Sequence, residues 1–310
     1  MVVARMRSRF LRWAMLLRVL GLSELRVLKL AAHIAKTELE GIGRKNTRIT
    51  LTNRPRGDGG GSQILYSAFG LAVARALGLE YQHRIFETVE HIVGDATVFR
   101  ERWNRLVDFE SAFPRPSTKP TYSLGSRVHT LRALLSVRRR FSITSSRFRY
   151  LIDENPEWLH SIRPQLREIY VRQVDPAPGK SDSAVTFHAR RGDVTKTQNA
   201  GMYTSADELI ADISKIRSVP AYKDLWAEIV IEENDPELEM MLPHKCRLIV
   251  IGEPFEAFDR LVEAKILVID KSSFSYVAGL ISQNTVIYRD YWYPPMPDWL
   301  HLANLASPEL

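Results

Sequence analysis

The chain of 310 residues contains a single cysteine, Cys246, which excludes a disulfide within the chain. A chain without disulfides fits a reducing compartment. Long apolar runs are also missing near the N-terminus: the uncharged stretch Trp13 to Leu17 falls far short of the roughly 18 residues that a membrane-spanning helix needs. No small-residue cleavage site follows the basic N-terminus, so we expect no signal peptide. These absences predict a cytoplasmic protein.

Metal-binding patterns are absent as well. No cluster of histidine and cysteine has the spacing of a metal site. No two aspartates stand as Asp-x-Asp, a pair with which many enzymes hold a divalent metal. A glycine-rich run, Gly57 to Gln63, is neither the G-x-G-x-x-G fingerprint nor a Walker loop, because no Gly-Lys-Ser/Thr follows it. We therefore predict that the protein uses no metal and no other cofactor.

The composition is that of a folded globular protein, with 45% hydrophobic and 25% charged residues. Its formal net charge of +7 favours anionic partners, which include nucleotides, nucleic acids and acidic membrane surfaces. No recognisable nucleic-acid-binding motif and no interleaved aromatic and basic patch is present. We therefore expect no nucleic-acid partner.

Residues 1–45 form a basic extension in which arginines alternate with apolar residues. Arg5, Arg7, Arg9 and Arg12 interleave with large apolar side chains around Phe10 to Leu17. This pattern predicts helices and fits a basic amphipathic helix on a membrane surface. A helix packed on the rest of the protein fits it equally well.

Strand and helix patterns alternate along the remaining chain, which predicts the α/β class with parallel sheets covered on both faces. We expect one Rossmann-like domain at 46–175 and a second at 183–290, joined by a Pro- and Gly-containing linker at 174–183. The tail at 291–310 is rich in proline and aromatic residues, and we expect it to pack across the domains without regular structure.

The first domain should open with a strand at 48–52, the glycine-rich loop, a helix at 64–77 and a strand at 79–83. The region from about 95 to 175 is predicted to be mostly helical. In the second domain, apolar segments predict five strands and polar-apolar periodicity predicts four helices between them. The expected strands are 184–188, 228–231, 247–251, 266–270 and 285–288, and the expected helices are about 205–217, 235–241, 256–264 and 274–283.

The most informative motif is His188-Ala189-Arg190-Arg191-Gly192-Asp193, which follows the strand predicted at 184–188. Ligands of open α/β sheets bind at the carboxyl ends of the strands. Arginine is well shaped to hold a diphosphate through planar, bidentate hydrogen bonds. The motif therefore predicts a nucleotide diphosphate site, although a surface turn of solvated charges would look similar.

Two further motifs fit the same site. Lys271 to Tyr276 places three serines and a lysine between a predicted strand and a predicted helix, where free N–H groups and the helix dipole bind phosphate. A simple helix cap would account for one of these serines. The glycine-rich run could let the backbone approach a ligand closely, or serve only as a flexible turn. A weaker candidate is Glu232 to Asp235, where a carboxylate could hold ribose hydroxyls or the base.

Taken in order, these motifs resemble the GDP-fucose-dependent fucosyltransferase superfamily of α1,2-, α1,6- and protein O-fucosyltransferases. The shared pattern is a Gly-rich loop with Gly-x-Gln before a helix, a central His-x-Arg-Arg-Gly-Asp, and a late Ser-Ser-Phe-Ser, spread over about residues 55–295. The central motif is most similar to the bacterial branch. The resemblance implies a GT-B fold of two Rossmann-like domains facing across a cleft, with 46–175 on the acceptor side and 183–290 binding the nucleotide sugar.

The resemblance also implies a reaction, namely inverting transfer of fucose from GDP-fucose to a hydroxyl of a glycan acceptor, without a metal. It implies catalytic roles for Arg191, Arg190 and His188. The residues that would bind the donor are Asp193, Lys271, Ser272, Ser273, Phe274, Ser275, Gly60, Gly61, Gln63 and Glu232. The general base stays open among Asp58, Glu90, His91 and Glu232.

Two alternatives remain at this point: a GT-B glycosyltransferase with another nucleotide sugar, and a non-catalytic nucleotide- or glycan-binding protein of the same fold. Relatives in the secretory pathway carry a membrane anchor and usually disulfides, and neither is visible here. This difference favours a cytoplasmic, bacterial enzyme. A lipid-linked acceptor would give the basic N-terminus a reason to contact the inner face of the membrane.

Overall fold

The computed structural model describes residues 48–53, 58–116, 121–123, 140–144, 148–173, 184–191 and 194–305. The predicted extension at 1–45, the predicted linker at 174–183, Gly57 and Asp193 lie outside the described residues.

The described chain divides into two compact units. Unit 1 takes residues 48–53, 66–85 and the described part of 109–162. Unit 2 takes 58–65, 86–108 and the described part of 163–305. The predicted domain boundaries at 46–175, 183–290 and 291–310 stay a prediction.

Unit 1 contains a four-stranded parallel sheet in the order β2-β1-β4-β3. Its strands are β1 (Arg48–Thr52), β2 (Glu80–Gln82), β3 (Thr121–Ser123) and β4 (Arg140–Thr144). Its helical parts are the later turns of α3 (Gly60–Leu77), α5 (Phe109–Ala112), α7 (Phe148–Glu154) and the first part of α8 (Pro156–Glu168). The strands β3 and β4 correct the expectation of a mostly helical region after residue 95. Lateral pairing of β4 with β1, and of β3 with β4, stabilises segments whose own pattern is weak.

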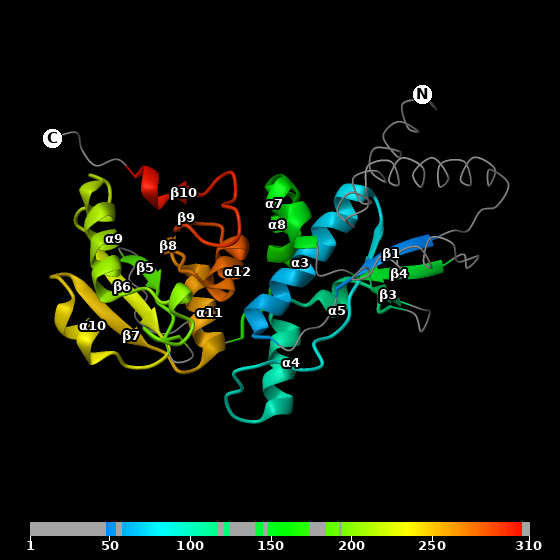
Figure 1. Ribbon diagram of the computed structural model, residues 1–310, viewed down its shortest axis with the longest axis horizontal. Coiled ribbons are helices and arrows are strands. Elements are labelled where there is room, and N and C mark those ends of the chain that lie inside the picture. The colour runs from blue at the N-terminus through cyan, green and yellow to red at the C-terminus, as the bar shows by residue number, and fades with distance from the viewer. Residues whose placement is uncertain are drawn as a thin grey trace. The chain divides into compact units, whose positions relative to one another are not determined.

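Unit 2 contains a six-stranded sheet in the order β10-β9-β8-β5-β6-β7, in which every neighbouring pair is parallel (Figure 1). Its strands are β5 (Ala184–His188), β6 (Trp226–Ile231), β7 (Cys246–Val250), β8 (Ile266–Val268), β9 (Thr285–Tyr288) and β10 (Leu300–His301). The α/β class with parallel sheets is confirmed. The five strands predicted between 184 and 288 all form, with ends shifted by one or two residues.

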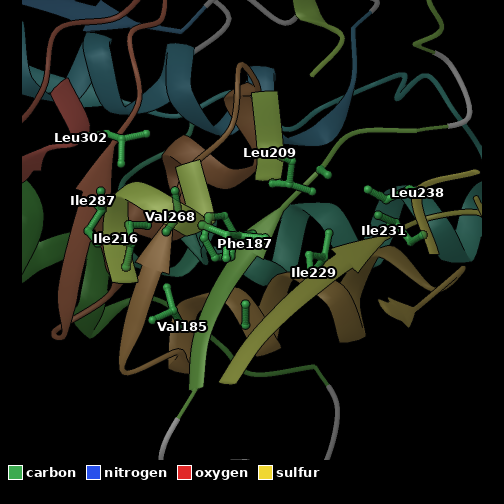
Figure 2. Close-up of a cluster of buried hydrophobic side chains, with 13 residues drawn as sticks. Val185, Phe187, Leu209, Ile216, Ile229, Ile231, Leu238, Val268, Ile287 and Leu302 are labelled. Atoms are coloured by element: carbon green, nitrogen blue, oxygen red, sulfur yellow. The ribbon is translucent and has the colours of Figure 1, made fainter. Parts of the chain in front are cut away.

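Helices cover both faces of this sheet. One face packs on α9 (Ala206–Ser218), α10 (Pro236–Met241) and the 3-10 helix Leu302–Asn304, through a buried apolar cluster (Figure 2). The cluster comprises Val185, Phe187, Ala189, Leu209, Ile213, Ile216, Ala227, Ile229, Ile231, Leu238, Val268, Ile287 and Leu302. The other face meets α11 (Pro254–Glu263) and α12 (Ser273–Ile281), because Arg260 of α11 bonds Glu228 of β6 and a Cβ at Gly279 of α12 would touch Ile269 and Val286.

Capping residues set where these helices begin. Ser205 and Glu208 form a capping box at the start of α9. Asp235 and Glu253 accept backbone N–H bonds at the starts of α10 and α11, and each is followed by a proline at the first helical position. These caps fix the loops that follow β5, β6 and β7, and so fix the carboxyl edge of the sheet.

Two local expectations are corrected by the structure. The glycine-rich run is a loop only at its start, because α3 already begins at Gly60 and therefore includes Gly61, Ser62 and Gln63. The tail was expected to lack regular structure, but Leu300–His301 pairs with β9 as strand β10 and the 3-10 helix follows it. Its packing across the domains stays a prediction.

Within the described part of the chain, no helix has the length and apolar character required to cross a membrane.

Candidate active site

The loops after β5 and β8 are tied together by a buried carboxylate, Asp270. This side chain is 2% exposed. Its Oδ2 accepts the backbone N–H of Arg190 at 3.0 Å, and its Oδ1 accepts the hydroxyl of Thr204 at 2.5 Å. The guanidinium of Arg289, at the end of β9, lies 3.5 Å from the same carboxylate. Asp270 therefore fixes the path of the chain where the His188-to-Asp193 motif begins.

Arg191 is the most informative side chain of the site because it is a buried cation, only 6% exposed. Its Nε donates to Asp235 Oδ2 at 2.8 Å, and its Nη1 donates to the carbonyl of Arg190 at 2.9 Å. The ring of Tyr203 lies 4.7 Å from the guanidinium carbon, in cation–π contact. Its Nη2 is buried and has no hydrogen-bond partner among the residues that the structure describes.

This arrangement leaves one guanidinium nitrogen for a ligand. A buried donor without a partner costs about 1–3 kcal/mol, so native proteins rarely keep one without a reason. An anionic oxygen would satisfy Nη2 and would be held in a site of low exposure, where charge interactions are strong. The geometry therefore suits an anion at the carboxyl end of β5.

Asp235 holds Arg191 in place from the start of α10. Its Oδ1 accepts the N–H of Leu238 at 3.0 Å while its Oδ2 accepts from Arg191. Burial acts to raise the pKa of Asp235, but the Leu238 N–H and the Arg191 guanidinium outweigh it, so the pKa lies below its usual value. The carboxylate stays ionised and pins the Nε edge of the guanidinium.

The first turn of α12 lies beside this loop. The rings of His188 and Phe274 are 5.5 Å apart. Ser275 Oγ accepts the N–H of Asp270 at 3.1 Å, and Ser272 Oγ accepts the N–H of Phe274 at 3.2 Å. These two hydroxyls are almost fully buried and hold the loop. Their role as donors to a diphosphate stays a prediction. The partly exposed Ser273 and the remaining N–H groups of the turn keep that capacity.

Gly60 and Gly61 matter for packing within unit 2. A Cβ at Gly61 would lie 2.8 Å from the backbone Cα of Phe274, and a Cβ at Gly60 would overlap the ring of Trp103. The first turns of α3 and α12 therefore meet at backbone contact. Two positive helix ends converge there, which adds to the preference for an anion.

The other residues of the glycine-rich run hold the loop that follows. Gln63 is 3% exposed, and its amide nitrogen donates to the carbonyls of Thr88 at 2.6 Å and Asp58 at 3.1 Å. Asp58 accepts the Ser62 hydroxyl at 2.7 Å, and its carbonyl accepts the N–H of Glu90. Gln63 thus ties the loop at residue 88 to the start of α3, and its place in the lining of a donor site stays a prediction. The candidate bases Asp58 and Glu90 come together here.

The remaining predicted residues lie at the same sheet edge with different partners. Lys271 pairs with Glu208 at 3.3 Å, and Arg190 Nη1 contacts the sulfur of Met202 at 3.3 Å. Glu232 follows the end of β6 and is exposed. It belongs to the same loop as Asp235, but the contact with Arg191 is made by Asp235.

A second carboxylate, Asp212 of α9, pairs with Arg289, which also donates to Thr204 at 2.6 Å. Burial raises the pKa of Asp212 to about 6, although the positive charge of Arg289 opposes this. The hydrogen-bonded chain from Asp212 through Arg289 to Asp270 supports the backbone at Arg190.

Sequence analysis named Asp235 only within the run Glu232 to Asp235, as a possible contact of ribose or base, and missed its pairing with Arg191. It missed Asp270 and Tyr203 altogether. The Asp235-Pro236 pair is a helix-start signal, since a capping aspartate and an N1 proline are both favoured there. That signal could have singled out Asp235 within its loop. Nothing local to Tyr203 or Asp270 indicates their contacts, which depend on the fold.

Among the described residues, no three histidine, cysteine, aspartate or glutamate side chains group as a cation site. The independence from metal stays a prediction.

No protein-family model matches the chain, and no curated protein matches its sequence. Solved structures with some similarity include a mutant of Arabidopsis thaliana FUT1 in complex with GDP, at 9% identity and a TM-score of 0.41, covering 85% of this chain and 75% of that one. The NodZ α-1,6-fucosyltransferase soaked with GDP-fucose has 14% identity and a TM-score of 0.34, covering 76% and 92%. The Escherichia coli heptosyltransferase WaaC with ADP-2-deoxy-2-fluoro heptose has 10% identity and a TM-score of 0.36, covering 84% and 96%. With every TM-score below 0.5, no conclusion rests on these similarities.

Proposed function

We propose that the protein is an inverting, metal-independent glycosyltransferase that moves fucose from GDP-fucose to a hydroxyl of a glycan acceptor. The observation that carries the proposal is Arg191, a buried guanidinium held by Asp235 and Tyr203, with one nitrogen that has no partner within the described part of the chain. The choice of GDP-fucose as donor rests on the resemblance of the motifs at residues 57–63, 188–193 and 271–276.

The chemistry follows from charge. Breaking the bond between the sugar and the phosphate gives an oxocarbenium-like sugar and leaves negative charge on GDP. Arg191 Nη2 would meet an oxygen of the departing phosphate, and the first-turn N–H groups of α12 would meet another. These donors are fixed before the reaction and stabilise the leaving group more in the transition state than in the ground state. Arg191 would thus do the work that a metal does in other transferases.

Inversion requires the acceptor hydroxyl to attack the face of the sugar opposite the leaving phosphate. The proton of that hydroxyl passes to a base or to solvent. Asp58, Glu90, His91 and Glu232 stay as candidates for the base. Asp58 is already bonded to the Ser62 hydroxyl and the Gly59 N–H, which favours a structural role for it.

The test is Arg191→Lys, which keeps a positive charge but loses the planar fork. We expect transfer from GDP-fucose to fall by about 100-fold or more, because losing one fixed donor to a developing charge costs about 3 kcal/mol. Release of GDP from GDP-fucose, measured with and without a glycan mixture, reports the rate.

Arg260→Lys is the matched control, since Arg260 also forms a buried ion pair, with Glu228 at 2.7 Å, on a face of the same sheet. It should lose stability but keep its turnover. Equal turnover in Arg191→Lys and the natural protein would remove the basis of the proposal.

A further inference from the structure

The loop after β9 presents an exposed tryptophan on a rigid support. Trp292 is 53% exposed, and its ring stacks on that of Tyr291 with centroids 5.2 Å apart and planes 16° from parallel. Burying a large apolar side chain fully would stabilise the fold by about 1.5–3 kcal/mol, and about half of this stabilisation is forgone here. A single exposed aromatic residue is ordinary, so its support and its position decide what it can do.

Buried tyrosine hydroxyls hold the loop on both sides of Trp292. Tyr288 Oη donates to the carbonyl of Tyr293 at 2.7 Å and accepts the N–H of Tyr291 at 3.0 Å. Tyr276 Oη, from α12, donates to the carbonyl of Pro294 at 2.7 Å. The Trp292 backbone is therefore fixed by its neighbours. A ring fixed in this way is preorganised and loses little freedom when a ligand stacks on it.

The loop also lies at the edge of the sheet that carries the candidate active site. β9 is parallel to β8 and leaves the sheet at the same carboxyl edge. Arg289, the first residue after β9, contacts Asp270, which also bonds the N–H of Arg190. Trp292 is three residues further on, so its Cα lies within about 11 Å of that of Arg289.

The groups around Trp292 indicate the kind of ligand. Asp290 is a carboxylate whose side chain is 82% exposed, and it pairs with His301 at 3.1 Å. Arg289, in contrast, is turned inward with its side chain 12% exposed. Asp290 is two residues before Trp292 in the same loop. A loop that carries both an aromatic face and an exposed hydrogen-bond acceptor suits a sugar ring, which offers an apolar C–H face and a rim of hydroxyls. Tryptophan also favours membrane interfaces, but the exposed carboxylate disfavours an acidic lipid surface.

We propose that Tyr291 and Trp292 form a saccharide-binding platform, with a sugar ring stacked on Trp292 and hydroxyls bonded to Asp290. Its role as the acceptor subsite rests on the proposed function. Saccharide binding itself does not.

The test compares full-length variants on an array of immobilised gluco-, galacto-, manno- and N-acetylglucosamine oligosaccharides, with GDP binding measured by calorimetry in parallel. We expect the natural protein to bind at least one saccharide class and Trp292→Ala to lose about tenfold in affinity. Trp292→Phe, which keeps a ring, should retain part of the binding. Trp226→Ala is the control, because Trp226 is 43% exposed but begins β6, at the opposite edge of the sheet.

Equal binding by Trp292→Ala and Trp226→Ala would overturn the platform, as would a natural protein that binds no saccharide on the array. Sedimentation with phosphatidylglycerol vesicles is measured on the same variants, and a Trp292→Ala variant that loses only this sedimentation would also overturn the platform. The GDP measurement separates the two proposals. GDP binding without saccharide binding overturns the platform alone, and Trp292-dependent saccharide binding without GDP binding overturns the transferase alone.

Discussion

At the scale of single residues, the protein positions one guanidinium with three different kinds of contact. Asp235 fixes the Nε edge of Arg191, Tyr203 covers its face, and the Arg190 carbonyl takes Nη1. Each contact restricts a different motion of the side chain. Because Nε and Nη1 are already bonded, Nη2 is the nitrogen that can bind a ligand. The pair with Asp235 is the contact that a substitution tests most simply.

Asp235→Asn removes the negative charge and keeps one acceptor oxygen, which can accept from Arg191 or from Leu238 but not from both as the two carboxylate oxygens do. Because charge-assisted hydrogen bonds are roughly twice as strong as neutral ones, we expect Arg191 to be held less firmly. Transfer should fall about tenfold, which corresponds to about 1.4 kcal/mol, with the Michaelis constant for GDP-fucose changing less than the turnover rate. Steady-state kinetics measures both.

Glu237→Gln serves as the control for Asp235→Asn, because Glu237 lies in the same helix and pairs with Lys196 on the surface. Its kinetics should match those of the natural protein. A turnover rate for Asp235→Asn equal to that of Glu237→Gln would show that Asp235 only caps α10.

At the scale of elements, the site depends on how closely two helix starts approach one another. Gly61 of α3 lies against the backbone of Phe274 in α12. Alanine favours a helix over glycine by about 1 kcal/mol, so Gly61→Ala would stabilise a free helix. Here the added Cβ meets backbone, and overpacking of this kind costs about 1–3 kcal/mol. We expect Gly61→Ala to lower the melting temperature and to weaken GDP binding.

Gly201→Ala is the matched change, since a Cβ at Gly201 has no neighbour within 4 Å. Thermal unfolding of the two variants should differ by several degrees. If Gly61→Ala melts at or above the temperature of Gly201→Ala, the close contact between the helix starts is not real.

The stability of the elements around Arg289 depends on pH because the pKa of Asp212 is raised to about 6 in the folded protein. The folded state then holds this proton more tightly than the unfolded state does. The stability that the proton contributes is complete below about pH 4 and is lost as the pH rises through 6. Asp212→Asn should therefore gain stability relative to the natural protein between pH 4 and 7, by on the order of 2 kcal/mol.

Denaturant unfolding at several pH values measures this difference. Asp224→Asn, at a side chain that is 75% exposed, should follow the natural protein across the same range. A constant offset for Asp212→Asn at every pH would contradict the raised pKa.

The burial and pairing of each strand explain which elements could be predicted from the sequence. Strands β5, β6, β8 and β9 are buried between two helical layers, so they appear as apolar runs and were predicted. β4 contains Phe141 and Ile143 among polar residues, and it forms through pairing with β1, which no local pattern reveals. The start of α3 at Gly60 also depends on a distant residue. The ring of Trp103 leaves no room for a Cβ at this position, so a glycine that suggests a loop in the sequence begins a helix in the structure.

For the candidate site, the sequence located the loops but not the contacts within them. The motifs at 188–191 and 271–275 lie at one sheet edge, as expected from parallel topology. The serine hydroxyls turned out to hold the loop, and the partner of Arg191 came from the third loop, after β6. Such pairings join residues 44 and 80 positions apart, and they follow only from the folded chain.

At the scale of the whole molecule, the net charge and the site at the sheet edge favour one class of ligand. A formal charge of +7 and a buried arginine at the edge of a parallel sheet favour a nucleotide diphosphate over a neutral ligand. The proposed donor, GDP-fucose, differs from other nucleotide sugars in its base and its sugar. Binding of different donors therefore tests the proposal before any acceptor is known.

The most direct measurement is calorimetric titration of the full-length protein with GDP, GDP-fucose, GDP-mannose, UDP and UDP-glucose, each with and without EDTA. We predict binding of the guanosine compounds only, unchanged by EDTA, with affinity for GDP reduced at least about tenfold in Arg191→Lys. A preference for uridine nucleotides would contradict the proposed donor, and binding that EDTA abolishes would contradict the role given to Arg191. Absence of binding to all five would contradict the central claim itself.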